Sequence, residues 1–427
     1  MTENSSSNQV SPLSFVIRLP GSPIGPDLSK HFLINKNHKE YDIFSNSKGH
    51  HNHLIHHYLA AYAFGASKER LQTIFDDHAS HQRPLRDPIG TITFETYQSE
   101  LGNRDAYTSY LIFFQKDIKK HGIIGAIRRG VLQNMDMLAR TLSGIFHPLI
   151  HLGYAIEFDL PNVAAEGLAM AACEDNALAA FLVDKDTQAD GHDNMNGNQT
   201  IETILTNMKW DPIFDDIVKF GDEYFSMGIF TNEKVISIIR EYAAQWHYKD
   251  PQSSVRELYT QVMLLCASTG IHGQQTKMDF FLMHCLTSIH AAHTLLAHLT
   301  SDEAEKLLRA HLVETLLFYL RCGRPNLNVE ALQNFKPTTA VATCVQGENN
   351  DNLWLGVIQQ SLGVKEPHYI KVVRALALGQ ILYHDVFEDD LWLKAAQVAF
   401  NVVETQSMKE GEQWWDYGGI GFEQGWN

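Results

Sequence analysis

Residues 279–293 read DFFLMHCLTSIHAAH. Apolar residues recur at helical spacing along this stretch, and no charged residue follows Asp279 within it. We therefore expect a helix over residues 277–298 that is buried in the protein core. His284 lies inside this apolar helix, where an imidazole without a hydrogen-bond partner would cost about 1–3 kcal/mol to bury.

The rest of the chain repeats the helical pattern. Strand signals are sparse: the best are 91–94 (TITF) and 338–345 (TTAVATCV), and neither belongs to an alternating series. The sequence therefore predicts an all-α fold, a large multi-helix bundle or array. The other expected helices cover residues 66–77, 105–120, 163–183, 232–246, 253–268, 301–321, 366–383 and 386–404.

Residues 1–427 are expected to form one helical domain. Residues 184–200 lack periodicity and are rich in Asp, Asn and Gly, so we expect an exposed loop, which could divide the domain into two lobes. The polar residues 1–12 are expected to form a disordered tail. Residues 411–427 are rich in Trp and Gly and are expected to pack back onto the body.

Composition limits the classes of function. Hydrophobic residues make up 44% and charged residues 20% of the 427 residues, which is typical of a globular protein. The net charge of −16 disfavours a nucleic-acid partner. Five scattered cysteines without a CxxC pair predict neither a disulfide framework nor a thiolate zinc site. With no secretory signal and no apolar run of ~18 residues, a cytoplasmic protein without a membrane span is expected.

Five of the 22 histidines fall within residues 50–57, HHNHLIHH. The sequence continues as an apolar run to Gly65, which predicts a helix over residues 52–63. His53 and His57 are four residues apart and share one face of that helix, and His56 lies one residue off the face. Two imidazoles at this spacing can bind one metal ion, but the glutamate of an HExxH motif is absent.

Histidines recur in three other expected helices. Residues 147–157, HPLIHLGYAIE, carry His147 and His151 four residues apart, and 367–374, PHYIKVVR, carry His368 three residues before Lys371. Imidazole suits iron, zinc, copper or nickel, and helical bundles build internal metal centres from facing helices. The residues alone leave two interpretations open: a histidine-dominated non-haem iron site in the helical core, or ordinary hydrogen-bonded core histidines.

Lys371 is unusual among these candidates, because a protonated ammonium cannot bind a cation. Beside a metal it must be neutral, with its pKa lowered by burial and nearby charge, or be carboxylated by carbon dioxide to an oxygen-donating carbamate. The simpler alternative is a surface lysine.

The sequence resembles the questin oxidase-like family of fungal enzymes. The resemblance rests on five segments in the same order, which together span nearly the whole chain. They are NHLIHHYLAAYAFGAS (52–67), FHPLIHLGYAIEF (146–158), DFFLMHCLTSIH (279–290), HYIKVVRALALGQ (368–380) and GIGF (419–422).

This resemblance implies an enzyme of fungal polyketide metabolism that uses dioxygen to open the quinone ring of an anthraquinone or a related polycyclic aromatic. The implied centre is a non-haem Fe(II) held by histidines and a carboxylated lysine. The implied ligands here are His53 or His57, then His151, His284, His368 and Lys371. Which of His53, His56 and His57 binds metal stays open.

Two further residues are candidates for orienting the substrate or donating hydrogen bonds: Tyr154, one turn after His151, and Thr287, three residues after His284. Packing roles are the alternative for both. Phe280 and Phe281 could line an aromatic pocket, although they point to different helix faces and at least one is expected to belong to the ordinary core.

Three functions besides the iron oxygenase remain open. The family has also been described as NADPH-linked Baeyer–Villiger oxidases, but no GxGxxG follows a strand here, so no Rossmann domain for flavin or nicotinamide is visible. NADPH could still act through another site. The second function is metal-dependent hydrolysis with the same ligands. The third is a non-catalytic helical scaffold that binds structural zinc or no metal.

Overall fold

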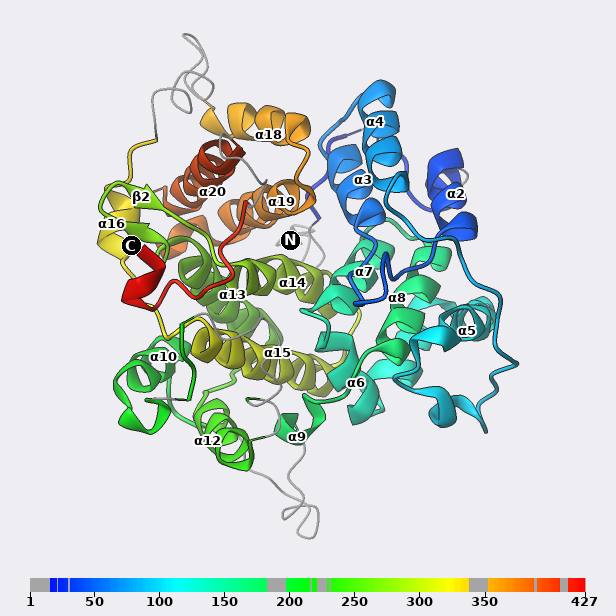
Figure 1. Cartoon of the computed structure of the whole chain (residues 1–427), viewed down its shortest axis with the longest axis horizontal. Helices are drawn as coiled ribbons and strands as arrows, with labels where there is room; N and C mark the ends of the chain where they lie inside the picture. The colour runs from blue at the N-terminus through cyan, green and yellow to red at the C-terminus, as the bar shows by residue number, and fades with distance from the viewer. Residues whose placement is uncertain are drawn as a thin grey trace, which may run out of the picture.

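The computed structural model is almost entirely helical (Figure 1). It describes residues 16–182 except 21 and 30, residues 197–337 except 216, 221–228, 230 and 231, and residues 352–426 except 388, 389 and 408–413. The helices are α1 (Pro26–Ser29), α2 (Phe32–Glu40), α3 (Leu54–Ala63), α4 (Lys68–Ala79), α5 (Tyr107–Ile127), α6 (Met135–Leu142), α7 (His147–Glu157), α8 (Pro161–Cys173), α9 (Ala179–Leu182), α10 (Ile201–Trp210), α12 (Glu233–Ala244), α13 (Pro251–Ala267), α14 (Phe280–Leu296), α15 (Ser301–Arg321), α16 (Val329–Gln333), α18 (Leu353–Gly363), α19 (Pro367–Tyr383) and α20 (Leu391–Ser407).

Helix α14 is the centre of the fold, because every one of its residues is buried. A helix that is apolar on all sides must be surrounded by other elements. Helices α7, α13, α15 and α19 pack against it, and α3 closes a ring by contacting both α7 and α19. Figure 1 shows α14 near the middle of the molecule, with α19 above it, α15 below it and α7 beside it. The predicted all-α class and the predicted buried helix are confirmed.

Four helices of this core, α3, α7, α14 and α19, begin close to one another, and each start has a local cause. The side chain of Asp279 accepts hydrogen bonds from the backbone N–H groups of Phe281 and Leu282 and so caps α14. Glu366 caps α19 in the same way. The side chain of Asn52 accepts from the N–H of Leu54 at the start of α3.

A strained turn sets the start of α7. Gly144, Ile145 and Phe146 have φ values of 59°, 58° and 60°, so three consecutive residues adopt the left-handed conformation. Outside glycine this conformation costs roughly 1–2 kcal/mol per residue. A Cβ at Gly144 would lie 2.9 Å from the carboxyl carbon of Glu174, so glycine is required there. Strain of this kind persists where the surrounding packing fixes the backbone, often at functional sites.

The strands are limited to one hairpin among the described residues, in which β1 (Ile271–His272) pairs antiparallel with β2 (Gln275–Thr276). The predicted strand at 91–94 is wrong, because these residues form no ladder and continue into a turn. The other predicted strand, 338–345, lies outside the described residues. So do the predicted tail, 1–12, and most of the predicted loop, 184–200. The division into domains or lobes stays a prediction.

The predicted helix over 163–183 is too long. Helix α8 ends at Cys173, and Glu174 adopts an extended conformation. The Glu174 carboxylate contacts His51 at 2.7 Å, and the guanidinium of Arg140 donates to its backbone carbonyl. Tertiary hydrogen bonds therefore override the local helix propensity of the Ala-rich sequence.

The C-terminal segment packs back onto the body as expected. The N–H of Asp416 donates to the carbonyl of Met278, and the N–H of Phe280 donates to the carbonyl of Asp416. Trp415 is buried in this segment. Residues 414–417 therefore cover the start of α14. No helix of the described chain is both long and apolar enough to span a bilayer.

A stability prediction follows from Glu314 on α15, a buried carboxyl whose Oε2 has no hydrogen-bond partner among the described residues. Burial, and to a smaller extent the negative charge of Asp175, raise its pKa to about 8. The folded protein therefore holds a proton between pH 4.5 and 8 that the unfolded chain lacks, so this group makes stability fall as pH rises through that window.

Replacing the carboxyl by a neutral amide, Glu314→Gln, removes this dependence. We expect the free energy of unfolding to rise relative to wild type by about 1–3 kcal/mol at pH 8 and to change little at pH 5, as measured by denaturant titration. An equal change in the free energy of unfolding at pH 5 and pH 8 would contradict a raised pKa of Glu314.

Candidate metal centre

Four histidines converge where the four core helices begin. One side-chain nitrogen of each lies within 4.8 Å of those of the other three. His53 immediately precedes α3, and His147 is the first residue of α7. His284 lies one turn after the first residue of α14, and His368 is the second residue of α19. Within the described chain, no other group of three or more His, Cys, Asp or Glu residues has this metal-compatible geometry.

Each of the four rings is held through Nδ1. The acceptor is the carbonyl of His51 for His53 at 2.8 Å, of Gly144 for His147 at 2.6 Å, and of Phe280 for His284 at 2.7 Å. For His368 the acceptor is the Glu366 carboxylate at 2.5 Å. An Nδ1–H that donates to an oxygen leaves the lone pair on Nε2, which is the usual arrangement of a metal-binding histidine. The strained turn before α7 has a role here, since it presents the Gly144 carbonyl to His147.

The Nε2 atoms are left without ordinary partners. Those of His284 and His368 are buried and accept no hydrogen bond from the described residues. Those of His53 and His147 lie 2.8 Å apart. With both rings protonated at Nδ1, two lone pairs face each other at that distance, which is unfavourable unless a cation lies between them. Two ligands bound at ~2.1 Å and at right angles to each other would be about 3 Å apart. The geometry therefore fits a metal ion.

Electrostatics keep these rings neutral, which is the form that binds metal. Burial lowers the pKa of each well below its ordinary value, and neighbouring histidines and Lys371 lower it further. The positive ends of the helix dipoles at the helix starts act in the same direction.

Lys371 lies one turn after His368 and is also buried, with 2% of its surface exposed. The surface-lysine interpretation is therefore wrong. Its Nζ has no hydrogen-bond partner in the described part of the chain. Burial lowers its pKa, although the Glu366 carboxylate opposes this effect. A neutral amine of this kind can react with carbon dioxide.

The structure brings together only some of the predicted ligands. His53, His284 and His368 belong to the cluster, but His57 and His151 do not. Both ring nitrogens of His151 are engaged, with His56 at 3.1 Å and with Glu166 at 2.9 Å, and Nδ1 of His57 contacts His78 at 3.1 Å. On α7 the cluster residue is His147, which was not among the predicted ligands.

A local signal could have identified His147. Pro148 follows it and marks the first turn of a helix, as Pro367 does before His368. Asp279 and Asn52 are capping residues near His284 and His53. His53, His147 and His368 thus lie beside a helix-start signal. His284 does not differ from His151 in this respect, since each is the fifth residue of its helix.

Three other histidines near the site, His38, His56 and His151, belong to a separate buried network. His151 and His38 both bond the carboxylate of Glu166, at 2.9 and 2.6 Å, and His56 contacts His151. Burial alone would raise the pKa of Glu166, but the hydrogen bonds from His151 and His38 hold it at about 2. This network links α2, α3, α7 and α8, and it explains why His151 is buried without joining the cluster.

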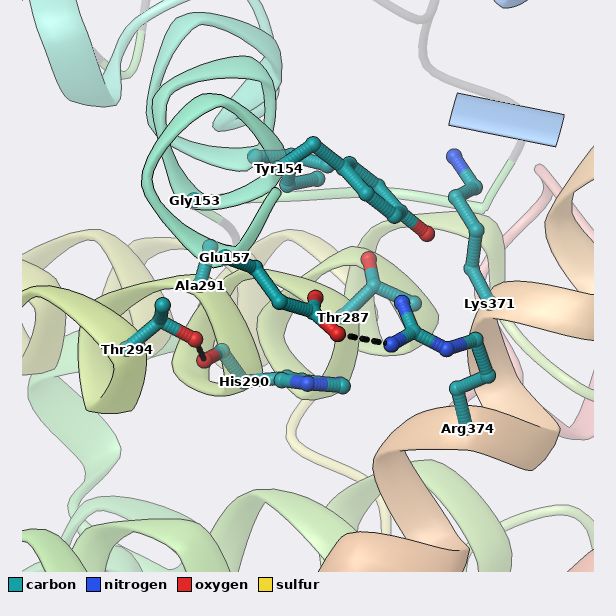
Figure 2. Close-up of a pocket in the computed structure, with 10 residues that line it drawn as sticks. Gly153, Tyr154, Glu157, Thr287, His290, Ala291, Thr294, Lys371 and Arg374 are labelled. Carbon is teal, nitrogen blue, oxygen red and sulfur yellow. Dashed lines mark hydrogen bonds and ion pairs between the residues drawn. The ribbon is translucent and has the colours of Figure 1, made fainter. Parts of the chain in front are cut away.

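A narrow pocket begins at Lys371 and extends between α7, α14 and α19 (Figure 2). Tyr154 and Thr287, the two residues predicted to act on substrate, both line it. Burial raises the pKa of Tyr154 to about 12, so its hydroxyl stays protonated at neutral pH. A Cβ on Gly153 would lie 2.5 Å from the Cβ of Ala291, so α7 and α14 are in close contact beside the pocket.

The two phenylalanines at the start of α14 differ in their surroundings. Phe280 contacts the rings of His284 and His368, at centroid distances of 4.4 and 5.3 Å. Phe281 instead packs on Phe318 and belongs to the ordinary core. Of these two phenylalanines, only Phe280 shields the four histidines.

Comparison with known proteins gives one consistent answer. The questin oxidase-like family matches residues 50–376. A questin oxidase of Aspergillus terreus is 26% identical over 96% of this chain and 94% of its own length. A protein named Baeyer–Villiger oxidase mdpL, from Emericella nidulans, is 27% identical over 88% of each chain, and Baeyer–Villiger oxidase ptaJ, from Pestalotiopsis fici, is 25% identical over 92% of this chain and 91% of its own.

Paired alanine variants on the same helix test which histidines bind metal. We expect His53→Ala and His147→Ala to weaken Fe(II) binding by more than about 100-fold, because each removes a lone pair from the cluster. His57→Ala on α3 and His151→Ala on α7 should retain the metal. Anaerobic calorimetric titration of the metal-free proteins measures all four affinities, and equal losses within either pair would contradict the assignment.

Proposed function

The chain belongs to the questin oxidase-like family, and from this premise we propose that it is a non-haem iron oxygenase that cleaves a carbon–carbon bond in the quinone ring of an anthraquinone or related polycyclic polyketide. The observation that carries the proposal is the set of four histidines whose Nδ1 atoms are held by oxygen acceptors and whose Nε2 atoms face one another. The pocket of Lys371, Tyr154 and Thr287 lies beside it.

The reaction class rests on the relatives. Those similar over most of their length are named questin oxidase, Baeyer–Villiger oxidase or Baeyer–Villiger monooxygenase, so the chain is an oxidoreductase. The name questin oxidase denotes oxidation of a quinone, and we extend that substrate class to this chain.

Iron fits the donor set. Neutral imidazoles bind Fe(II), zinc, copper or nickel, and a structural zinc site is normally closed by four ligands. Here Lys371 lies next to four histidines as a candidate fifth donor. When bound, iron would supply the activation of dioxygen that an organic side chain cannot provide.

Lys371 is proposed to bind as a carbamate. Burial favours its neutral amine, which is the form that reacts with carbon dioxide. The product is an anion, and it would lie among four helix starts, whose dipoles favour negative charge. The neutral amine acting as a direct ligand is the alternative.

The other pocket residues would position the substrate and exclude water. Tyr154 keeps its proton, so it can donate a hydrogen bond to a substrate oxygen but does not act as a base at neutral pH. The Thr287 hydroxyl donates to the carbonyl of His284 at 3.3 Å, which ties the pocket wall to a cluster residue. Phe280 and the C-terminal segment shield the histidines from solvent.

Iron dependence distinguishes this function from a hydrolase or a scaffold. We expect the iron-loaded protein to consume dioxygen when given a hydroxyanthraquinone and to release a ring-opened product, whereas the metal-free and zinc-loaded forms should not. An oxygen electrode and mass spectrometry of the product measure this. Stoichiometric zinc, with no oxygen uptake after iron loading, would contradict it.

NADPH dependence separates the iron mechanism from an NADPH-linked Baeyer–Villiger mechanism. If the substrate is supplied as the quinone and not as its reduced hydroquinone, oxygen uptake should proceed without NADPH. Consumption of one NADPH for each dioxygen, followed at 340 nm, would favour the NADPH-linked mechanism.

The carbamate is tested by Lys371→Ala. We expect oxygen uptake to fall roughly 100-fold or more and iron content to fall with it, because the site loses its anionic donor. Formate or acetate should partly restore both. An active, iron-replete Lys371→Ala protein would exclude a ligand role for Lys371.

A further inference from the structure

The end of the pocket away from the histidines contains polar groups that the proposed reaction does not use. Along α19, His368, Lys371 and Arg374 are spaced three residues apart and share one face. At 1.5 Å per residue, Arg374 lies about 9 Å along the helix from His368. His290 lies on the facing side of the pocket, on α14.

Arg374 is buried, with 1% of its surface exposed, and is held from two sides. Its Nη2 donates to the Glu157 carboxylate and, at 2.8 Å, to the carbonyl of Ile17. The ring of Tyr154 lies beside the guanidinium, with 5.5 Å between Cζ and the ring centroid, and the two side chains are also hydrogen-bonded. The group is therefore fixed in place. Its Nε–H has no acceptor among the described residues.

His290 is 7% exposed, and its Nε2 is also without a partner in the described chain. Figure 2 shows its ring pointing toward the guanidinium of Arg374, and Tyr154 and Thr287 border the same space. Burial, and then the positive charge of Arg374, lower the pKa of His290 well below its ordinary value, so the ring is neutral. A neutral ring facing a guanidinium is most stable with its lone pair, not its N–H, directed at the positive charge.

If the ion pair of Arg374 and Glu157 had only a structural role, Arg374 Nε–H and His290 Nε2 would not need to be left without partners. Each unmatched buried polar group destabilises the folded protein. Both residues line the same pocket, and each has one buried atom without a partner among the described residues: the donor Arg374 Nε–H and the acceptor His290 Nε2. A hydroxyl group of a bound molecule would satisfy both atoms, because it can accept a hydrogen bond from Arg374 Nε–H and donate one to His290 Nε2. A carbonyl or an ether oxygen could satisfy only the arginine.

We propose that Arg374 and His290 form a subsite that binds a phenolic hydroxyl of the substrate, at the end of the ring system remote from the four histidines. The inference rests on the proposed function, since it takes the pocket as the quinone site. Glu157 is the positioning residue: it holds the guanidinium so that Nε faces the pocket. The subsite fixes the direction in which a flat polycyclic substrate enters, and so selects which part of the ring system approaches the histidines.

Binding to the metal-free protein tests the subsite without relying on turnover. The probes are 2-hydroxyanthraquinone, 2-methoxyanthraquinone and anthraquinone, followed by quenching of tryptophan fluorescence at a pH where the phenol is protonated. The hydroxyl compound should bind wild type about tenfold more tightly than the other two, as expected for one buried hydrogen-bonding group. His290→Leu should remove this advantage without changing the affinity for the ether and the parent quinone, and His290→Gln, which keeps an acceptor, should partly restore it.

Two further variants complete the test. Thr294→Val is the matched control in the same pocket: the Thr294 hydroxyl already donates to the carbonyl of His290 at 3.1 Å, so the preference should be unchanged. The double variant Arg374→Met with Glu157→Gln removes the ion pair without leaving a lone buried charge and should also lose the preference. If it does not fold, the His290 variants decide the question alone.

The outcomes separate the subsite from the proposed function. Equal affinity of wild type for the hydroxyl and methoxy compounds, or an equal loss for all three probes in His290→Leu, would overturn the subsite and leave the quinone pocket intact. Failure of wild type to bind any of the three quinones would overturn both.

Discussion

The interaction on which the rest of the structure depends is the hydrogen bond from each cluster histidine, through Nδ1, to an oxygen acceptor beside its helix start. A buried imidazole must be satisfied at both nitrogens. These bonds satisfy one nitrogen and fix the tautomer, so the lone pairs of four rings are directed at a single point. A cation would relieve the repulsion between the lone pairs, so the four histidines could hold a metal ion.

This arrangement constrains the fold around it. Four helices have to begin at the same place, although helix starts carry unpaired N–H groups and like-directed dipoles that repel one another. The chain meets this requirement with side-chain caps at Asn52, Asp279 and Glu366, and with the left-handed turn at 144–146. The C-terminal segment then covers the start of α14. The same helix starts are suited to an anion beside the metal, such as a carbamate on Lys371.

Helices α7, α14 and α19 all run away from the four histidines, and together they enclose the pocket. Its polarity changes along its length. The buried amine of Lys371 lies at the end near the histidines. At the other end lie Arg374, ion-paired with Glu157, and His290, whose Nε2 has no partner among the described residues. The close contact between Gly153 and Ala291 keeps two of the walls near each other. In the proposed function, the reaction would take place at one end of this pocket and the substrate would be oriented at the other.

The sequence by itself determined the helical class and the buried helix at 277–298, because helical periodicity is a local property that can be read along the chain. The resemblance to the questin oxidase-like family added His284 and His368 as candidate ligands. The sequence could not separate His53 from His57, or His147 from His151, since histidines four residues apart share one helix face. That choice was made by the tertiary structure: where each helix begins decides which ring reaches the common point, and Glu166 and His78 bind the rings that do not. The subsite of Arg374 and His290 likewise exists only in the folded chain, because its two halves lie on different helices and meet through packing.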